Sequence, residues 1–295
     1  MRSSPSISSR LGTLALTAAL ALLPLVSHAE EAKPVDTSRI VSIGGAVTEL
    51  VYALGEEKRL IARDSTSLYP PEALKLPDVG YMRQLSPEGV LATNPTAILA
   101  IEGSGPPDAL AVLKSASVPV AMVPDKFSRD GILEKIDTIG AVLHVEDKAK
   151  TLHDSVAADL DKAIAAAEAR PQAERKRVLF ILSLQNGKVM ASGTGTAADG
   201  IIRLSGLVNA AGDFPGYKAM TDEAIVEAKP DVILMMERGG NHDATVQEIV
   251  AHPALGLTPA AVHKAVIRMD GLHLLGFGPR TASAIRDLIA RVYGG

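Results

Sequence analysis

Short apolar runs and helical stretches alternate along the first part of the chain. The run from Arg39 to Gly44 is typical of a buried strand that ends in a glycine turn. Residues 47–54 follow as a predicted helix, and Gly55 is typical of the position just after a helix C-terminus. Because strands alternate with helices, this half predicts an α/β lobe with a mainly parallel sheet. Its further strands are predicted at residues 60–62, 97–101 and 118–123.

The middle of the chain has a different pattern, without strand signals. From Ser128 to Ala169 it is rich in Ala, Leu, Lys, Glu and Asp, and all of these except Asp are strong helix formers. Ser128 is placed as an N-cap, Asp130 suits the first turn, and Pro171 ends the run. The pattern predicts a long helical bridge with a break within residues 140–145.

Beyond the bridge the first pattern returns. Strands are predicted at residues 177–182, 231–236 and 265–269, and an amphipathic helix is predicted at 279–293. We therefore expect an α/β fold of two Rossmann-like lobes with mainly parallel sheets, joined by the helical bridge, with a ligand cleft between the lobes. The expected divisions are an N-terminal lobe over 30–127, the bridge over 128–171 and a C-terminal lobe over 172–295.

The two lobes share a repeated sequence unit. SPEGVLATNPTAIL at 86–99 aligns with TDEAIVEAKPDVIL at 221–234. Each copy begins with Ser or Thr, has Glu third and Pro tenth, and ends in Ile-Leu. Both copies predict an N-capped helix, a break at the proline and then a buried strand. Two similar lobes make the cleft between them the expected binding place.

The first 29 residues have the pattern of a secretory signal peptide. Arg2 and Arg10 make the start basic, residues 11–26 are largely apolar, and Ser27-His28-Ala29 supplies small residues before a cleavage site. We expect cleavage after Ala29. The alternative is a transmembrane anchor, which fits less well because the apolar stretch is short and a proline lies near its end.

Composition narrows the class of partner. The chain has 30 lysines and arginines against 34 acidic residues, and loss of the leader with its two arginines leaves 28 against 34, a net charge of −6. An acidic chain without a basic stretch argues against nucleic acid or an anionic membrane as partner. The absence of cysteine excludes disulfides, thiolate metal sites and a lipid anchor on an N-terminal cysteine. We expect a soluble protein of a bacterial-type periplasm, without membrane insertion.

The sequence contains no familiar catalytic motif. It has no G-x-S-x-G, Walker A or H-E-x-x-H pattern, and GTGTAADG departs from the dinucleotide-binding spacing. No two of the seven histidines have H-x-x-x-H spacing, so a zinc site is poorly supported. We therefore expect a binding protein rather than an enzyme.

The chain resembles the periplasmic substrate-binding proteins of ABC importers whose lobes are joined by a rigid helix. RIVSIGGAVTELVYALG, SLYPPEALKLPDVGY and AKPDVIL carry this resemblance, which covers essentially the whole mature chain. DVGYMRQLSPEG and MDGLHLLGFGPRTASAI are similar to the haem-binding branch of the group. The resemblance implies ferric haem (ferric protoporphyrin IX) as the transported ligand. It also implies a monomer that delivers this ligand to an inner-membrane ABC permease with its cytoplasmic ATPase.

The resemblance further implies that Tyr81 is the axial ligand of the haem iron. Ferric iron is a hard ion and a phenolate is a hard oxygen ligand. A free tyrosine titrates near ~10, so a nearby positive charge is needed to favour the phenolate at neutral pH. In an extended segment alternate side chains share a face, which places Arg83 to hydrogen-bond the phenolate oxygen, the role that the family gives an arginine there. On spacing alone, Tyr81 is also compatible with a loop tyrosine that packs the surface between the lobes.

Three further residues are expected in the haem pocket. Met82 lies between Tyr81 and Arg83 and faces the other way if the segment is regular. Arg63 and Arg238 each follow a predicted strand and are placed to meet the two haem propionates. Each of these arginines is also compatible with a solvated surface residue.

The number of haems is a separate expectation. Some members of the branch hold a second haem on a histidine of the C-terminal lobe, and the comparable loop here, MASGTGTAADG at 190–200, has no histidine. The resemblance therefore favours one haem per chain, or a second one held only by stacking.

The glutamates of the repeated unit form the other predicted functional pair. In this importer group one glutamate on each lobe docks onto arginines of the permease, and Glu88 and Glu223 match by position. Each is expected in the first turn of a helix, where an acid also stabilises the helix dipole by ~0.3–1 kcal/mol. Both roles can hold together, and the pair argues against a free haem scavenger, which needs no permease contact.

A ferric-siderophore or cobalamin binder of the same importer group is the alternative. A siderophore already coordinates its own iron, so Tyr81 and Arg83 would then have no iron to bind. A protein that stays colourless with hemin would support this alternative.

Overall fold

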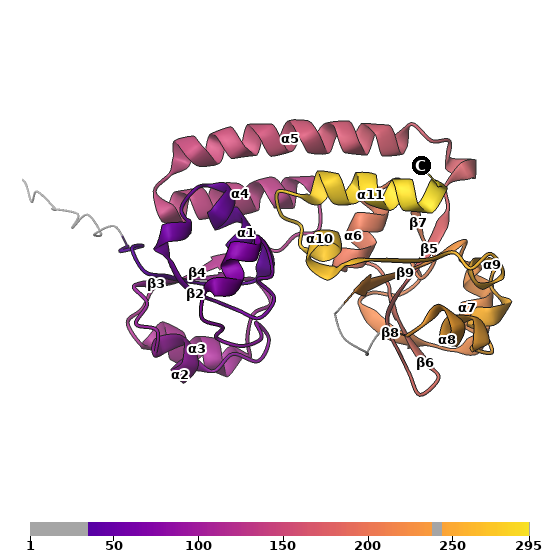
Figure 1. Ribbon diagram of the computed structural model, residues 1–295, viewed down its shortest axis with the longest axis horizontal. Coiled ribbons are helices and arrows are strands. Elements are labelled where there is room, and N and C mark those ends of the chain that lie inside the picture. Colours follow the sequence, from indigo (N-terminus) through magenta and orange to yellow (C-terminus); the bar gives the residue numbers. More distant parts are fainter. Residues whose placement is uncertain (1–34, 238–243, 295) are drawn as a thin grey trace, which may run out of the picture. The chain divides into compact units, whose positions relative to one another are not determined.

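The computed structural model describes residues 35–237 and 244–294, so the predicted leader at 1–29 and Arg238 lie outside the described residues. The described chain contains two β-sheets, each flanked by shorter helices, and a pair of long helices (Figure 1). Within these ranges no helix is both long and apolar enough to cross a membrane.

The first sheet has four parallel strands in the order β2-β1-β3-β4. Both β1 and β3 are buried along their whole length, which explains why they are continuous apolar runs rather than alternating ones. Helices between the strands complete the α/β lobe that the sequence predicts. The elements are β1 (Ile40–Ile43), α1 (Gly45–Ala53), β2 (Leu60–Arg63), α2 (Pro87–Leu91), β3 (Ala97–Ile101), α3 (Pro107–Ser115) and β4 (Val120–Val123).

The second sheet contains the expected parallel strands and an antiparallel part that the apolar pattern did not predict. Strands β10, β9, β5 and β7 run parallel, whereas β6 pairs antiparallel with both β5 and β8. The β5–β6 hairpin turns at Asn186-Gly187, where both residues have positive φ. Asn-Gly is a strong hairpin signal, so the missed hairpin did have a sequence signature. The strands are β5 (Arg177–Gln185), β6 (Lys188–Ser192), β7 (Val208–Asn209), β8 (Tyr217–Met220), β9 (Val232–Glu237) and β10 (Val266–Asp270).

Helices flank the second sheet, and several begin at a threonine cap. The hydroxyls of Thr196, Thr221 and Thr245 each accept a hydrogen bond from the backbone N–H three residues on. The helices are α6 (Ala197–Leu204), α7 (Asp222–Ala228), α8 (Val246–Ala251), α9 (Pro259–Val262), α10 (Gly271–Leu275) and α11 (Thr281–Tyr293).

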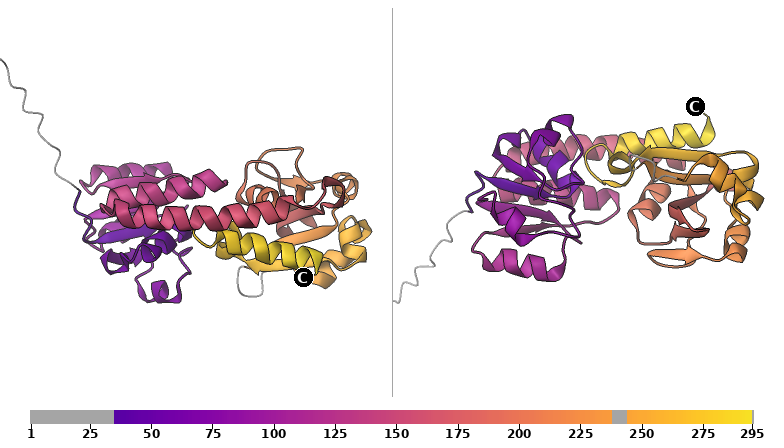
Figure 2. Two further views of the ribbon diagram at one scale, coloured as in Figure 1. Left: turned by 90° about the horizontal axis from the view of Figure 1, so that it is seen from above. Right: turned by 60° about the horizontal axis from the view of Figure 1, so that its bottom comes forward.

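Helices α4 (Arg129–Leu143) and α5 (Glu146–Glu168) form the predicted bridge (Figure 2). Ser128 Oγ accepts a hydrogen bond from Gly131 N at 3.1 Å, as expected of its N-cap. The break falls at His144, which is left-handed, and at Val145, inside the predicted interval.

Helix α5 packs closely against neighbouring segments near both of its ends. Its Ala149 lies against Gly140 of α4 and its Ala167 against Gly206 after α6, where a Cβ on either glycine would collide. These two contacts are about 27 Å apart along the helix. Close Gly–Ala contacts at both ends therefore fix the position of α5.

One hydrophobic cluster runs continuously through the first sheet, the bridge and part of the second sheet. It includes Ile98 of β3, Ile136 of α4, Leu160 of α5, Phe180 of β5 and Ile285 of α11. A smaller cluster occupies the other face of β5, where side chains alternate between the two faces. A continuous close-packed core resists large relative movement of the elements it contains.

The segment between α10 and α11 joins the two lobes. Phe277 O accepts a 3.2 Å hydrogen bond from Nζ of Lys135 on α4, a fully buried lysine that also pairs with Asp125 at 2.8 Å. The Phe277 ring meets Phe127 edge to face, with ring centres 5.3 Å apart. The C-terminal motif MDGLHLLGFGPRTASAI thus has a structural role between the lobes.

Candidate functional site

The segment that carries Gly80 and Tyr81 is a loop fixed to the end of β2. Arg63 N donates to Pro77 O and Val79 N donates to Arg63 O, each at 2.9 Å. Ser65 N donates to the carbonyl of Gly80, also at 2.9 Å. Gly80 has a φ of 97°, a conformation that suits glycine. The backbone before Tyr81 is therefore hydrogen-bonded to the last residue of β2 and to the segment that follows this strand.

Tyr81 and Arg83 lie together on the surface of this loop. Arg83 Nη1 donates a hydrogen bond to the Tyr81 hydroxyl oxygen at 2.9 Å. Tyr81 is 39% exposed, and Arg83 is exposed beside it. The expected hydrogen bond is therefore present.

The backbone that produces this contact is not the extended segment that we expected. Gln84 N donates to Tyr81 O at 2.8 Å, which closes a turn over residues 81–84. The turn, rather than strand alternation, brings Arg83 back to Tyr81. It also directs Met82 inward, where it is 8% exposed and part of the main hydrophobic cluster.

The other two expected pocket residues differ in position. Arg63 is also only 8% exposed, and its Nη1 donates to Asp78 Oδ2 at 2.9 Å and to the Asp64 carbonyl at 3.0 Å. Like Met82, it supports the loop from beneath. Arg238 lies outside the described residues.

Asp64 is a support that the sequence reasoning missed. Its carboxylate is fully buried and accepts hydrogen bonds from Gly44 N (2.9 Å), Ser67 Oγ (2.7 Å) and Thr66 Oγ1 (2.6 Å). A buried carboxylate is tolerated when donors satisfy it. Asp64 thereby links the turn after β1 to the loop after β2, which carries Tyr81.

The second lobe offers a different tyrosine, Tyr217, at the start of β8. Tyr217 pairs with Ser192 across the β6–β8 ladder, and its side chain is 40% exposed. Burial of its hydroxyl raises the pKa of Tyr217, although the Ser192 and Thr196 hydroxyls and the Arg83 guanidinium act in the opposite direction. Arg83 of the first lobe is thus close enough to act electrostatically on both tyrosines. No motif in the sequence pointed to Tyr217.

The two glutamates of the repeated unit occupy equivalent positions. Each is exposed in the first turn of its helix, Glu88 on α2 and Glu223 on α7. The caps predicted for these helices are present, with Ser86 Oγ accepting from Gly89 N at 3.2 Å and Thr221 Oγ1 from Ala224 N at 3.3 Å.

The same local groups act on both glutamates. The backbone N–H of Glu88 and the Ser86 hydroxyl lower the pKa of Glu88. The backbone N–H of Glu223 and the Thr221 hydroxyl lower its pKa in the same way. Both side chains are therefore carboxylates at neutral pH.

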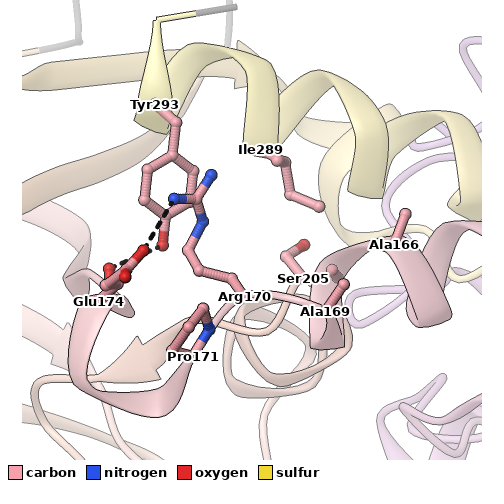
Figure 3. Close-up of a pocket in the computed structure, with 9 residues that line it drawn as sticks. Ala166, Ala169, Arg170, Pro171, Glu174, Ser205, Ile289 and Tyr293 are labelled. Atoms are coloured by element: carbon pink, nitrogen blue, oxygen red, sulfur yellow. Dashed lines mark hydrogen bonds and ion pairs between the residues drawn. The ribbon is translucent and has the colours of Figure 1, made fainter.

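A separate cavity of about 270 Å³ lies where α5 and α11 end (Figure 3). Arg170 lies 3.6 Å above the Tyr293 ring and 3.7 Å from Glu174 Oε2, and Ser205 and Ile289 complete the wall. The predicted site residues in the described part of the chain do not line this cavity. Its contacts close the end of the bridge against the C-terminal helix.

Comparisons with known proteins agree on the type of molecule. A family model described as periplasmic binding protein matches residues 40–271. The periplasmic haem-binding protein BhuT, solved in complex with two haems, is 37% identical, with 86% of this chain and 97% of BhuT covered and a TM-score of 0.81.

Two curated relatives are more distant. An uncharacterized ABC transporter substrate-binding lipoprotein, YvrC of Bacillus subtilis, is 28% identical over 88% of this chain and 81% of its own. A vitamin B12-binding protein of Pectobacterium carotovorum is 26% identical over 80% of this chain and 84% of its own. These relatives are substrate-binding transport proteins, not enzymes.

Proposed function

Because the chain belongs to the periplasmic binding protein family, we propose that it captures ferric haem between its lobes and delivers it to an inner-membrane ABC permease. In this proposal Tyr81 ligates the haem iron as a phenolate. The single observation that carries it is the 2.9 Å hydrogen bond from Arg83 Nη1 to the Tyr81 hydroxyl. A guanidinium at that distance stabilises negative charge on the oxygen that would bind iron.

The position of this pair supports ligand capture. Tyr81 is exposed on a loop that buried groups hold in place, so the ligand atom is positioned before the ligand arrives. Such preorganisation lowers the entropy cost of binding. The identity of 37% with a haem-binding protein also favours haem as the ligand.

Delivery would use the matched carboxylates. Glu88 and Glu223 are exposed, ionised and placed alike in the two copies of the repeat. Charges on two separate elements orient an encounter with a basic partner even though each exposed ion pair is weak. We propose that the protein acts in the periplasm as a monomer after its leader is removed at Ala29.

A corrinoid is the second candidate ligand, because a relative named as a vitamin B12-binding protein matches most of the chain. A ferric siderophore is the remaining alternative within the same importer group. Neither ligand needs an iron ligand from the protein.

An absorbance titration of the mature protein with hemin tests the proposal. We expect a saturable Soret change with a ferric-tyrosinate spectrum in the wild type and loss of that spectrum in Tyr81→Phe, which keeps the ring. A parallel titration with cyanocobalamin provides the comparison. Saturable cobalamin binding without saturable hemin binding would replace haem by a corrinoid, and equal hemin spectra in both proteins would remove Tyr81 as the ligand.

A further inference from the structure

This chain has few exposed aromatic side chains, and they differ in whether another residue covers the ring. All five tyrosines and four phenylalanines lie in the described residues, and Tyr69, Tyr81 and Tyr217 are the exposed ones among them. The Arg280 guanidinium lies 3.6 Å above the Tyr69 ring and covers it. Among the described residues no cation lies in this way over the rings of Tyr81 or Tyr217. One open aromatic side chain therefore remains on each lobe.

The backbone around Tyr217 is rigidly supported. Gly193 N donates to Gly216 O at 2.7 Å, and Gly216 N donates back to Thr194 O at 2.9 Å. A Cβ on Gly193 would lie 1.9 Å from Phe214 O, so the two segments approach as closely as glycine allows. The strand carrying Tyr217 is thus fixed to the loop between β6 and α6.

A buried carboxylate holds this loop from the other side. Asp199 is 3% exposed, and it accepts hydrogen bonds from Gly195 N and Asn209 Nδ2, each at 3.1 Å. Gly200, the next residue on α6, lies against Phe127, the residue just before the bridge. This contact places the start of α6 at the junction of the lobes, on the side of the second lobe that meets the first.

The hydroxyl and the ring of Tyr217 have different surroundings. Tyr217 is the ladder partner of Ser192, so their side chains share one face of the β6–β8 pair, and Ser192 Oγ lies 2.5 Å from Thr196 Oγ1. Burial raises the pKa of the Tyr217 hydroxyl. The side chain as a whole is 40% exposed, which leaves ring surface accessible. An iron ligand requires an accessible phenolate, whereas a stacking contact requires an accessible ring.

We infer that Tyr217 is the second lobe's contact with the porphyrin, its ring lying against the macrocycle while Tyr81 holds the iron from the first lobe. This inference rests on the proposed function. It assigns Tyr81 and Tyr217 different roles, the first through its oxygen and the second through its ring. A flat conjugated ligand fits such a surface because stacking is favourable over the whole face of an aromatic ring.

The test compares two variants at this position by hemin titration. Tyr217→Phe keeps the ring and loses the hydroxyl, so we expect its Kd to stay within about twofold of the wild type. Tyr217→Leu loses the flat surface, and we expect its Kd to rise about tenfold, the size of one aromatic stacking contact. Both variants keep the ferric-tyrosinate spectrum. Circular dichroism and thermal unfolding confirm that each variant is folded.

Iron-free protoporphyrin IX can stack on an aromatic ring but has no iron for Tyr81 to ligate, so its affinity measures stacking alone. The same titration tests the inference if Tyr217→Leu folds poorly. Without iron, Tyr81→Phe should bind like the wild type, whereas Tyr217→Phe should bind better than any folded variant that lacks an aromatic ring there. A changed visible spectrum in Tyr217→Phe with hemin, or unchanged porphyrin affinity without the ring, overturns this inference alone. Failure of the wild type to bind hemin overturns the proposed function and this inference with it.

Discussion

Arg280 forms a two-point ion pair with Glu49, with Nε and Nη2 at 2.8 and 2.9 Å from the two carboxylate oxygens. The residues are 231 positions apart in the chain, Glu49 on α1 and Arg280 just before α11. The carboxylate is buried and the guanidinium stacks on Tyr69. This contact ties the C-terminal helix of one lobe to the first helix of the other.

We expect Arg280→Met to lower the free energy of unfolding by about 2–3 kcal/mol, because it leaves a buried carboxylate without its partner. Urea denaturation measures the loss. Glu49→Gln and the double variant complete a mutant cycle. The sum of the losses in free energy of unfolding of the two single variants should exceed the loss in the double variant. Strictly additive losses would show that the ion pair contributes nothing of its own.

Arg83→Leu removes the positive charge next to the Tyr81 oxygen. We expect hemin to bind about 10- to 100-fold more weakly, which is the size of a hydrogen bond to a charged group. Dissociation of hemin to an apoprotein acceptor measures the change, and Lys114→Leu, an exposed cation on α3, is the matched control. Equal dissociation rates in all three proteins would argue against a role for Arg83 in ligand binding.

The repeated glutamates are expected to act in delivery and not in capture. Glu88→Gln and Glu223→Gln should each reduce permease-dependent haem uptake several-fold, and the double variant should nearly abolish it, since two contacts orient the complex. Hemin titration should be unchanged in all of these proteins. Glu227→Gln, exposed on the same helix α7 but outside its first turn, is the control. Wild-type uptake by the double variant would refute the docking role.

The pH dependence of docking follows from the lowered pKa values of Glu88 and Glu223. A carboxylate with a lowered pKa stays ionised until the pH falls through that lowered value, so its contribution is present at neutral pH and lost only in acid. Binding to the permease, expressed relative to the Glu88→Gln/Glu223→Gln protein, should therefore stay level from pH 7 to about 5. A loss centred near pH 6 would assign the dependence to other groups.

Close packing of the bridge predicts the effect of a single methyl group. In Gly140→Ala the added Cβ would lie 2.2 Å from the Cβ of Ala149, so α4 and α5 must separate. We expect a loss of about 1–3 kcal/mol in stability, measured by thermal unfolding. Gly89→Ala is the matched control, because its added Cβ meets only Ser86 at 3.6 Å and alanine favours a helix. Equal stabilities would show that the bridge has room to adjust.

Much of the fold was predictable because its signals are local. Ser86, Ser128 and Thr221 cap their helices through hydrogen bonds that span three residues, so the sequence pattern and the structure agree. In the repeated unit, Asn94 and Lys229 both adopt the left-handed conformation directly before a proline, which marks the predicted break in each copy. The resemblance to substrate-binding proteins of importers and the expectation of a non-enzymatic protein are confirmed by the family match and the relatives.

In the candidate site, too, only the features with local signals were predictable from the sequence. The residue types at Tyr81 and Arg83 indicated their pairing, but the turn that makes it possible and the inward direction of Met82 depend on how the loop is fixed to β2. Arg63 is predicted from the sequence to meet a haem propionate, and what the sequence does not show is that Asp78 holds it, buried, beneath the loop. Periodicity does not show which side of an irregular loop faces the core.

The sequence by itself determined the parallel strands of the first sheet, the helix caps at Ser86, Ser128 and Thr221, the bridge with its break, and the matched glutamates. These features depend on near neighbours and on the alternation of buried and exposed positions. Only the tertiary structure placed Tyr217 under the influence of Arg83 and joined Arg280 to Glu49. Such contacts connect residues more than a hundred positions apart, and they exist because the packed core brings distant segments together, which no local pattern encodes.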